Sequence, residues 1–372
     1  MRFVADSGLW GTAADTPAGP LVALLEVSGA VLSWTVDVPG APEITFTDPR
    51  RADWLWQVVG ESGHVAVAAA LDGADGHQVV DLPGVTLLAE PAERLRRLAL
   101  GHWLRRWWPA SRRDGIAGLD PALLDAELAV LTASAEDFFS DATPDSAVAD
   151  LLAPHPTALT VHALAGEPRV VALVRRCAEL ADDLGLNSPG WLQLYEALEV
   201  SSAARPAGHR DDYALAAGGD PGSHAHGVIA GGAGSLLWSA VPPAIFDAAE
   251  NTVDWTVDVV GAEVVATIRV ATIGQAGGIE VRLRSAGVGG VGVLDAGGRA
   301  TLRLFDGQQP MTETAAWDHR WPASTVTVGV ESPGPGESPE IRERIRRFAR
   351  NRLQRPGSDA YLAEIVAAES DY

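Results

Sequence analysis

The sequence predicts an α+β fold built from two related modules, each an antiparallel β-sheet or small sandwich followed by two helices. Three pairs of similar segments, which keep their order along the chain, carry this prediction: LSWTVDVPGA (32–41) with VDWTVDVVGA (253–262), ERLRRLA (93–99) with ERIRRFA (343–349), and, more weakly, DAELAV (125–130) with LAEIVA (362–367). Ordered matches of this kind are typical of an internal duplication. We therefore expect pseudo-twofold symmetry between the modules.

The matched segments divide the chain into four regions. The first module spans residues 1–139 and the second spans residues 236–372, so the two copies have nearly the same length. Residues 140–200 separate them as an all-helical insert. Residues 201–235 are rich in Gly, Ala and His without periodicity, which is typical of a long loop or linker.

Strands are expected first in each module. In WTVDV, Trp34, Val36 and Val38 alternate with polar residues, the period of a strand with one buried face, and Asp37 is expected to face solvent. The second copy repeats the pattern at Trp255, Val257 and Val259. Further strands are expected in ITFTD, WLWQVV, HVAVAAAL and VVDLPGVTLL of the first module and in AEVVATIRVAT, GIEVRLRS, RATLRLF and STVTVGVE of the second.

Two helices should close each module. In residues 91–108 an apolar stripe at helical spacing comprises Leu100, Trp103, Leu104 and Trp107, and Asp120 with Pro121 forms an N-cap and first-turn pair for the next helix. In the second module, Ile341, Ile345 and Phe348 share one helix face, Pro356 and Gly357 end that helix, and residues 358–372 follow as the last helix. The pattern is sheet, basic helix, acidic helix.

Bulk properties indicate a folded protein and exclude several classes. The chain has 372 residues, 47 % of them hydrophobic, and a formal net charge of −21, which repels nucleic acid and anionic membranes. Its longest uncharged stretch, residues 221–246, is broken by Gly, Pro and His and does not predict a membrane span. The first residues lack the pattern of a signal peptide. We expect a cytoplasmic protein without general nucleic-acid binding.

The cysteine and lysine content limits the kinds of catalytic site that the chain could contain. Cys177, the single cysteine, lies in an amphipathic helical run and is expected to be a small buried side chain. The 28 basic residues are all arginine, a bias typical of a high-GC bacterium. The absence of lysine excludes a Schiff base, a P-loop lysine and a kinase-type lysine. Selection against lysine-directed tagging is an alternative explanation for the same bias.

One candidate metal site lies in HRDDYALAAGGDPGSHAHG, residues 209–227. Six potential ligands occur within it, His209, Asp211, Asp212, Asp220, His224 and His226. In an extended backbone His224 and His226 point to the same side, which suits a divalent metal such as zinc bound with His209. The spacing matches no established zinc pattern, so a mobile polar loop with no cofactor is the other interpretation.

Two further motifs have structural explanations. Asp318 and His319 lie between Trp317 and Trp321, where a carboxylate could orient a histidine for acid or base chemistry. We favour the alternative, in which the two tryptophans anchor the start of a strand and the charged groups face water. GVGGVG at residues 287–292 matches GxGxxG by letter and lacks the strand-then-helix context of a nucleotide site. We interpret it as a turn.

Arginine placement is the strongest anomaly of the sequence. Half of all basic residues lie in two matched segments, Arg94, Arg96, Arg97, Arg105, Arg106, Arg112 and Arg113 in one and Arg342, Arg344, Arg346, Arg347, Arg350, Arg352 and Arg355 in the other. Pairing with the acidic helix that follows each segment is one interpretation. The functional interpretation is an acidic protein partner or phosphate-bearing ligand bound by Arg94, Arg97, Arg105, Arg344, Arg347 and Arg350.

The sequence therefore favours a noncatalytic protein-interaction component, a scaffold, adaptor or chaperone-like protein whose two modules pair with each other and present a composite surface. The absence of catalytic motifs agrees with this class. The alternative is an enzyme, a metal-assisted hydrolase or a specialised-metabolism enzyme, with its site at the module interface or under residues 209–226.

Overall fold

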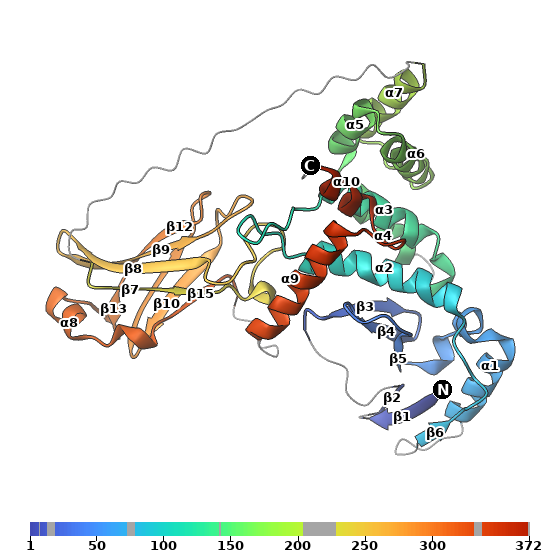
Figure 1. Cartoon of the computed structure of the whole chain (residues 1–372), viewed down its shortest axis with the longest axis horizontal. Coiled ribbons are helices and arrows are strands. Elements are labelled where there is room, and N and C mark those ends of the chain that lie inside the picture. The colour runs from blue at the N-terminus through green and yellow to red at the C-terminus, as the bar shows by residue number, and fades with distance from the viewer. Residues whose placement is uncertain are drawn as a thin grey trace. The chain divides into compact units, whose positions relative to one another are not determined.

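The chain folds into a mixed α+β structure that divides into two compact units. The computed structural model describes residues 1–6, 8–12, 19–72, 79–140, 143–203, 228–330 and 337–370. These ranges contain ten α-helices and three antiparallel sheets (Figure 1). Unit 1 comprises Met1–Trp108, Leu119–Pro206 and Ile341–Tyr372, and unit 2 comprises Pro109–Gly118 and Ala207–Glu340. The last two helices thus belong to unit 1, a different division from the predicted one.

Unit 1 contains a six-stranded sheet whose order is β3-β4-β5-β2-β1-β6. Its strands are β1 (Arg2–Asp6), β2 (Leu9–Gly11), β3 (Val22–Val27), β4 (Ala30–Thr35), β5 (Glu43–Phe46) and β6 (Val79–Asp81). Strands β3 and β4 form a hairpin, and Gly29 in its turn has φ +74°. A Cβ there would lie 2.3 Å from the carbonyl oxygen of Asp48, so this turn requires glycine.

Helix α3 is packed among five other helices of unit 1. The helices of this unit are α1 (Leu55–Asp72), α2 (Ala89–Trp107), α3 (Pro121–Ala133), α4 (Thr143–Leu152), α5 (Pro156–Ala165), α6 (Pro168–Asp183), α7 (Pro189–Ala203), α9 (Pro339–Gln354) and α10 (Leu362–Ser370). Helix α2 packs on β3, and α3 contacts α2, α4, α5, α6 and α10. Asp120 caps α3 by accepting from the N–H groups of Ala122 and Leu123, as predicted.

Helix α1 occupies the segments WLWQVV and HVAVAAAL, in which strands were predicted. Both segments are helical, with a kink at Gly60, where φ is +76°. The buried positions are Leu55, Val58, Val59, Gly63, Val67 and Leu71, spaced by three or four residues. A short run of Val and Ala fits both the two-residue period of a strand and the 3.6-residue period of a helix. The prediction of strands in these two segments was therefore wrong.

Unit 2 is a sandwich of two antiparallel sheets, ordered β14-β13-β11-β10-β15 and β12-β9-β8-β7. Its strands are β7 (Ala230–Gly234), β8 (Val253–Val260), β9 (Glu263–Val270), β10 (Glu280–Ser285), β11 (Val288–Val293), β12 (Arg299–Arg303), β13 (Phe305–Asp306), β14 (Gln309–Pro310) and β15 (Thr325–Val328), with one short helix, α8 (Glu313–Asp318). The predicted turn GVGGVG is strand β11. Its Gly290 lets the second sheet approach closely, because a Cβ there would lie 2.7 Å from the Arg303 carbonyl oxygen.

The two WTVDV segments differ in structure. In the first, β4 ends at Thr35, Trp34 and Val36 are buried, and Val38 is 51 % exposed, contrary to prediction. Pro39 and Gly40 follow directly, and a proline cannot donate to a sheet ladder, so the strand does not continue. In the second, β8 runs through the whole segment and buries Trp255 and Val257.

The predicted insert and linker are described in part. Residues 143–203 form α4 to α7, the stretch for which helices were expected. The region predicted as a loop, residues 201–235, contains the end of α7 and strand β7, which pairs with β8. Residues 204–227 lie outside the described residues. No helix within the described ranges has the length and apolarity needed to cross a membrane.

Gly101 in α2 generates a prediction about how the C-terminal segment packs. A Cβ at this position would lie 2.2 Å from Tyr361 Oη and 2.7 Å from Leu128 Cδ1. Gly to Ala normally stabilises a helix interior by about 0.5–1 kcal/mol. Here we expect Gly101→Ala to destabilise the fold by about 1–3 kcal/mol, because the methyl group overpacks the contact. Urea denaturation measures the change.

Tyr361→Leu supplies the control for this prediction. If overpacking against the phenol ring is the cause, the Gly101→Ala substitution costs less in the Tyr361→Leu background than in the native chain. Equal costs in the two backgrounds would contradict the packing between α2 and Tyr361.

Candidate functional site

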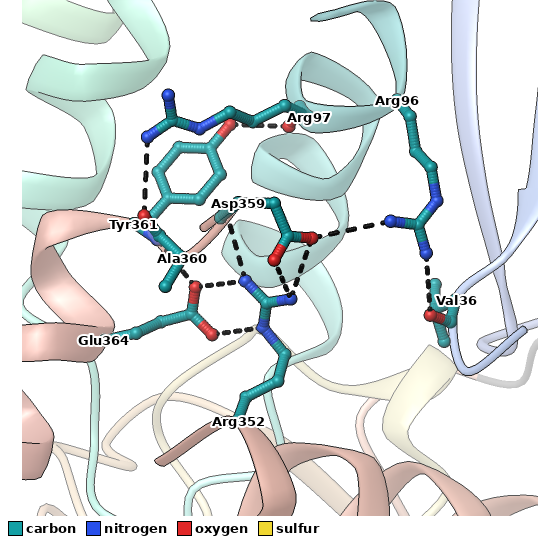
Figure 2. Close-up of polar contacts among 8 residues, drawn as sticks. All are labelled: Val36, Arg96, Arg97, Arg352, Asp359, Ala360, Tyr361 and Glu364. Carbon is teal, nitrogen blue, oxygen red and sulfur yellow. Dashed lines mark hydrogen bonds and ion pairs between the residues drawn. The ribbon is translucent and has the colours of Figure 1, made fainter. Parts of the chain in front are cut away.

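The arginines predicted to bind a partner lie in unit 1, and one of their neighbours, Arg352, occupies a buried site between α9 and α10. Its guanidinium binds both carboxylate oxygens of Glu364, which is fully buried, and Nη1 donates to both carboxylate oxygens of Asp359 at 3.1 and 3.2 Å (Figure 2). Burial lowers the pKa of Arg352, but its bonds to Glu364 and Asp359 outweigh this and raise the pKa. Arg352 is therefore a permanent cation matched by two carboxylates.

The same cluster ties the turn before α10 to α2 and α3. Arg96 Nη1 donates to Asp359 at 3.4 Å, and Arg97 donates to the Ala360 carbonyl at 3.4 Å (Figure 2). Arg97 also binds Glu127. Tyr361 Oη donates to the Arg97 carbonyl at 2.7 Å. Glu127 also accepts from the N–H of Leu362 at 2.6 Å. These bonds fix the start of α10 against two helices that are more than 200 residues earlier in the sequence.

Other arginines of the two segments also bind within unit 1. Arg344 forms a bidentate pair with Asp37, at 2.8 and 3.0 Å, which corrects the prediction that Asp37 faces solvent. Further pairs are Arg105 with Asp125, Arg346 and Arg350 with Glu343, and Arg94 with Glu90. Of the six arginines predicted to bind a partner, five thus have a carboxylate in the chain, and Arg347 is exposed.

The predicted metal ligands and the single cysteine do not form a site among the described residues. His209, His224 and His226 lie outside the described residues. Within the described part of the chain, no group of three or more His, Cys, Asp or Glu side chains could hold a metal ion. Cys177 is buried as predicted, and burial raises the pKa of its thiol to about 12.

His319 has an unexpected partner in unit 2. Its Nε2 lies 2.9 Å from Ser285 Oγ, and its ring packs edge-on against Trp321 at 4.6 Å. Trp321 is buried and donates to the Ala316 carbonyl, whereas Trp317 is 54 % exposed, so one of the two expected anchors is present. Because Ser285 is buried and weakly bonded to the Arg320 carbonyl, the pair is best explained as packing support.

A different feature of unit 1 offers an open binding surface, the edge of β3. Strand β3 is the last strand of its sheet. The Val36 N–H binds the Leu21 carbonyl, and backbone groups alternate in direction along a strand, so residues 21, 23, 25 and 27 face β4. The backbone groups of Leu24 and Glu26 therefore point to the open edge. No partner for their N–H groups is found among the described residues.

Chain segment 138–140 already begins to pair with this edge. The Ser28 N–H donates to the Phe138 carbonyl at 2.9 Å, and the hydroxyl groups of Ser28 and Ser140 are 3.1 Å apart. Phe139 has extended backbone angles, φ −110° and ψ 166°. An extended segment thus occupies the end of the edge, and no strand of the described part of the chain pairs with the rest of it.

A groove of about 460 Å³ lies along the unpaired edge. We call it the β3 groove, and its described lining consists of residues 24–28 with His102, Thr132, Phe139, Ser140, Thr143, Pro144 and Ala147. Side chains alternate across a sheet, so five consecutive residues can line one groove only along the strand edge. Leu24 is 56 % exposed there, and most of the other lining side chains are apolar or uncharged.

His102 is the polar group that α2 contributes to the groove. Burial lowers the pKa of its imidazole, Arg105 lowers it further, and Asp125 raises it. His102 is therefore neutral at neutral pH and can donate or accept one hydrogen bond. Asp125 itself is buried and binds both Arg105 and His155, each at 2.9 Å.

Sequence reasoning missed this site for an identifiable reason. The hairpin is signalled by Ser28 and Gly29 between two apolar runs, a common turn pair. Nothing in the sequence shows that residues 138–147 and His102 come to the same edge, since more than 70 residues separate them from β3. The open edge is a property of the sheet order.

Arg352 generates a prediction about stability. We expect Arg352→Met to lower the free energy of unfolding by about 3–5 kcal/mol, because it leaves the Glu364 carboxylate buried without its cation. Arg355→Met is the matched control, since Arg355 is exposed just beyond α9, and it should change stability by less than about 0.5 kcal/mol. Urea denaturation compares the two variants. Equal effects would show that the buried pair does not hold α10 in place.

His102 generates a prediction about pH. Its pKa is lowered in the folded state, so the stability it contributes is complete above the ordinary histidine pKa and is lost as pH falls through the lowered value. Between about pH 7.5 and about pH 5.5 we expect the urea midpoint of the native chain to fall more than that of His102→Asn. If both proteins lose stability in parallel, His102 is not buried as a neutral group.

Comparisons of the chain with protein-family models, with curated proteins and with solved structures give no match. The β3 groove is therefore interpreted through the chemistry of its own residues.

Proposed function

We propose that the chain is a noncatalytic protein-interaction component that binds an extended segment of another protein along the β3 groove. The unpaired backbone edge at Leu24 and Glu26, next to a groove of about 460 Å³, is the observation that carries the proposal. Addition of a strand to an exposed edge derives affinity from main-chain hydrogen bonds and specificity from pockets for alternate side chains. The groove offers both features.

The geometry favours a peptide over a small ligand. The free groups of an edge repeat along the strand axis, and only another backbone supplies donors and acceptors with the same repeat. Segment 138–140 supports this interpretation, because the Ser28 to Phe138 bond is the contact a neighbouring strand would make. A bound segment would extend the line that Phe139 begins.

Charge and lining indicate the composition of the segment. Glu26 is the one acidic residue in the described lining, and the whole chain carries −21. A basic segment is therefore attracted and an acidic one is repelled. Leu25, Pro144 and Ala147 provide apolar lining for alternate side chains. The proposed ligand is an extended segment in which apolar and basic residues alternate.

We also retain the internal duplication as a proposal. Each of the three matched pairs lies on the same kind of element: strands β4 and β8, helices α2 and α9, and helices α3 and α10. Two observations weigh against it. The sheets of the two units have different strand orders, and the aligned arginines Arg94 and Arg344 have unrelated partners. In this proposal the second module keeps the same order of strands and helices as the first, but its helices α9 and α10 belong to unit 1.

A backbone variant tests the proposed function. Proline is tolerated on an edge strand where the N–H faces outward, so Glu26→Pro removes one free donor without breaking the pairing between β3 and β4. With a peptide of about ten alternating Val and Arg residues as the probe, we expect Glu26→Pro to weaken binding about tenfold or more in fluorescence anisotropy. Glu26→Gln, which keeps the N–H, should weaken binding about threefold or less.

The same peptide N-methylated at every second residue is the decisive comparison. Methylation removes the donors that would pair with the edge and leaves the side chains in place, so it should abolish binding. Equal affinity of the methylated and unmethylated peptides would rule out strand addition. Failure of the native chain to bind any alternating Val and Arg peptide would contradict the proposed ligand composition.

A further inference from the structure

A second surface with a different chemistry lies on the hairpin of β10 and β11 in unit 2. Two positive-φ residues, Ala286 at +40° and Gly287 at +93°, connect the strands. The register places Arg282 opposite Val291 and Arg284 opposite Gly289. Since alternate residues share a face, Arg282 and Arg284 lie on one face of the hairpin while Leu283 is buried on the other.

The hairpin borders a hollow of about 680 Å³. We call it the arginine hollow, because Arg282, Arg284 and Arg303 line it and no carboxylate occurs in its described lining. Gly289 lies opposite Arg284 and has no side chain, so β11 places no side chain over this part of the hollow. Val291, which is 59 % exposed, and Phe305 add apolar surface. The hollow is a local concentration of positive charge in a chain of net charge −21.

Two of the ion pairs at the hollow are weak. Arg282 pairs with Glu280 at 2.6 Å, and Arg303 pairs with Glu263. All four side chains are between 38 and 53 % exposed, and pairs at such sites contribute about 0–1 kcal/mol because water and salt screen them. A ligand with a doubly charged group can therefore take over these guanidinium groups at little cost.

We propose that the arginine hollow binds a small organic phosphate. Guanidinium groups match the geometry of phosphate oxygens with paired N–H donors, and three arginines line this hollow. Val291 and Phe305 pack against the organic group of the ligand. The hollow lies within the size range of pockets that hold small molecules. This site belongs to unit 2 and does not depend on the proposed β3 groove.

Calorimetric titration of the full chain with phenyl phosphate tests the proposal, with inorganic phosphate and benzoate as comparison ligands. We expect saturable binding in which phenyl phosphate binds more tightly than either comparison, because it alone combines the charge with an apolar ring. The Arg282→Gln and Arg284→Gln double variant should weaken this binding by about tenfold or more. Absence of saturable binding to the native chain would overturn the proposal.

Two further variants keep the test independent of folding. Arg269→Gln with Arg299→Gln removes the same charge from exposed positions on β9 and β12, outside the hollow, and should leave phenyl phosphate binding within about threefold. Gly289→Val keeps every arginine and fills the open surface, where a Cβ makes only an ordinary contact with the Leu283 carbonyl at 3.5 Å. It should weaken binding about tenfold.

If the two double variants lose the same affinity for phenyl phosphate, the effect of charge is nonspecific and the proposal is wrong. A peptide of consecutive glutamates serves as the last comparison. Tighter binding of that peptide than of phenyl phosphate would assign the hollow to an acidic protein and not to an organic phosphate.

Discussion

Unit 1 depends on the buried ion pair between Arg352 and Glu364. Burying a guanidinium costs several kcal/mol unless carboxylates of good geometry surround it, and Glu364 and Asp359 do so. Glu364 also accepts from the Tyr361 N–H at 2.8 Å, so one carboxylate both neutralises the cation and caps α10. The pair thereby fixes the turn from which Tyr361 reaches α2. Helix α2 in turn presents His102 to the β3 groove.

Arginine is the only basic side chain that serves this cluster. Arg352 directs its donors to three groups at once, the two carboxylates and the Asp359 carbonyl at 3.4 Å. Lysine has three donors on a single atom and cannot span such a set. The exclusive use of arginine in the chain has a compositional explanation, yet at this position the structure requires it. The outer pairs, such as Arg94 with Glu90, are exposed and contribute little.

Local sequence patterns predicted most strands and the longer helices other than α1, but they could not predict which charged groups pair with each other. The Asp120 cap, the strand through Trp255 and Val257, and the buried Cys177 follow from spacing over a few residues. Helix α1 was missed because Val and Ala runs satisfy two periods. The pairing of Arg344 with Asp37 joins residues 307 positions apart, and it turned an apparently solvent-facing carboxylate into a structural one. The sequence shows where arginines are concentrated, but it does not show which carboxylate each arginine binds.

The same distinction explains why the two candidate sites have different chemistry. On α2 and α9, carboxylates of the chain pair with Arg94, Arg97, Arg105, Arg344 and Arg350, and the surface that we propose for recognition is the backbone edge of β3. On the hairpin of β10 and β11, Arg282 and Arg284 project from one sheet face, and Glu280, which pairs with Arg282, is 44 % exposed. The difference follows from desolvation. A buried arginine has lost its water and must keep one carboxylate partner, whereas an exposed arginine is still hydrated and can exchange partners. Charge density along a sequence is thus a poor guide to binding until the burial of each charge is known.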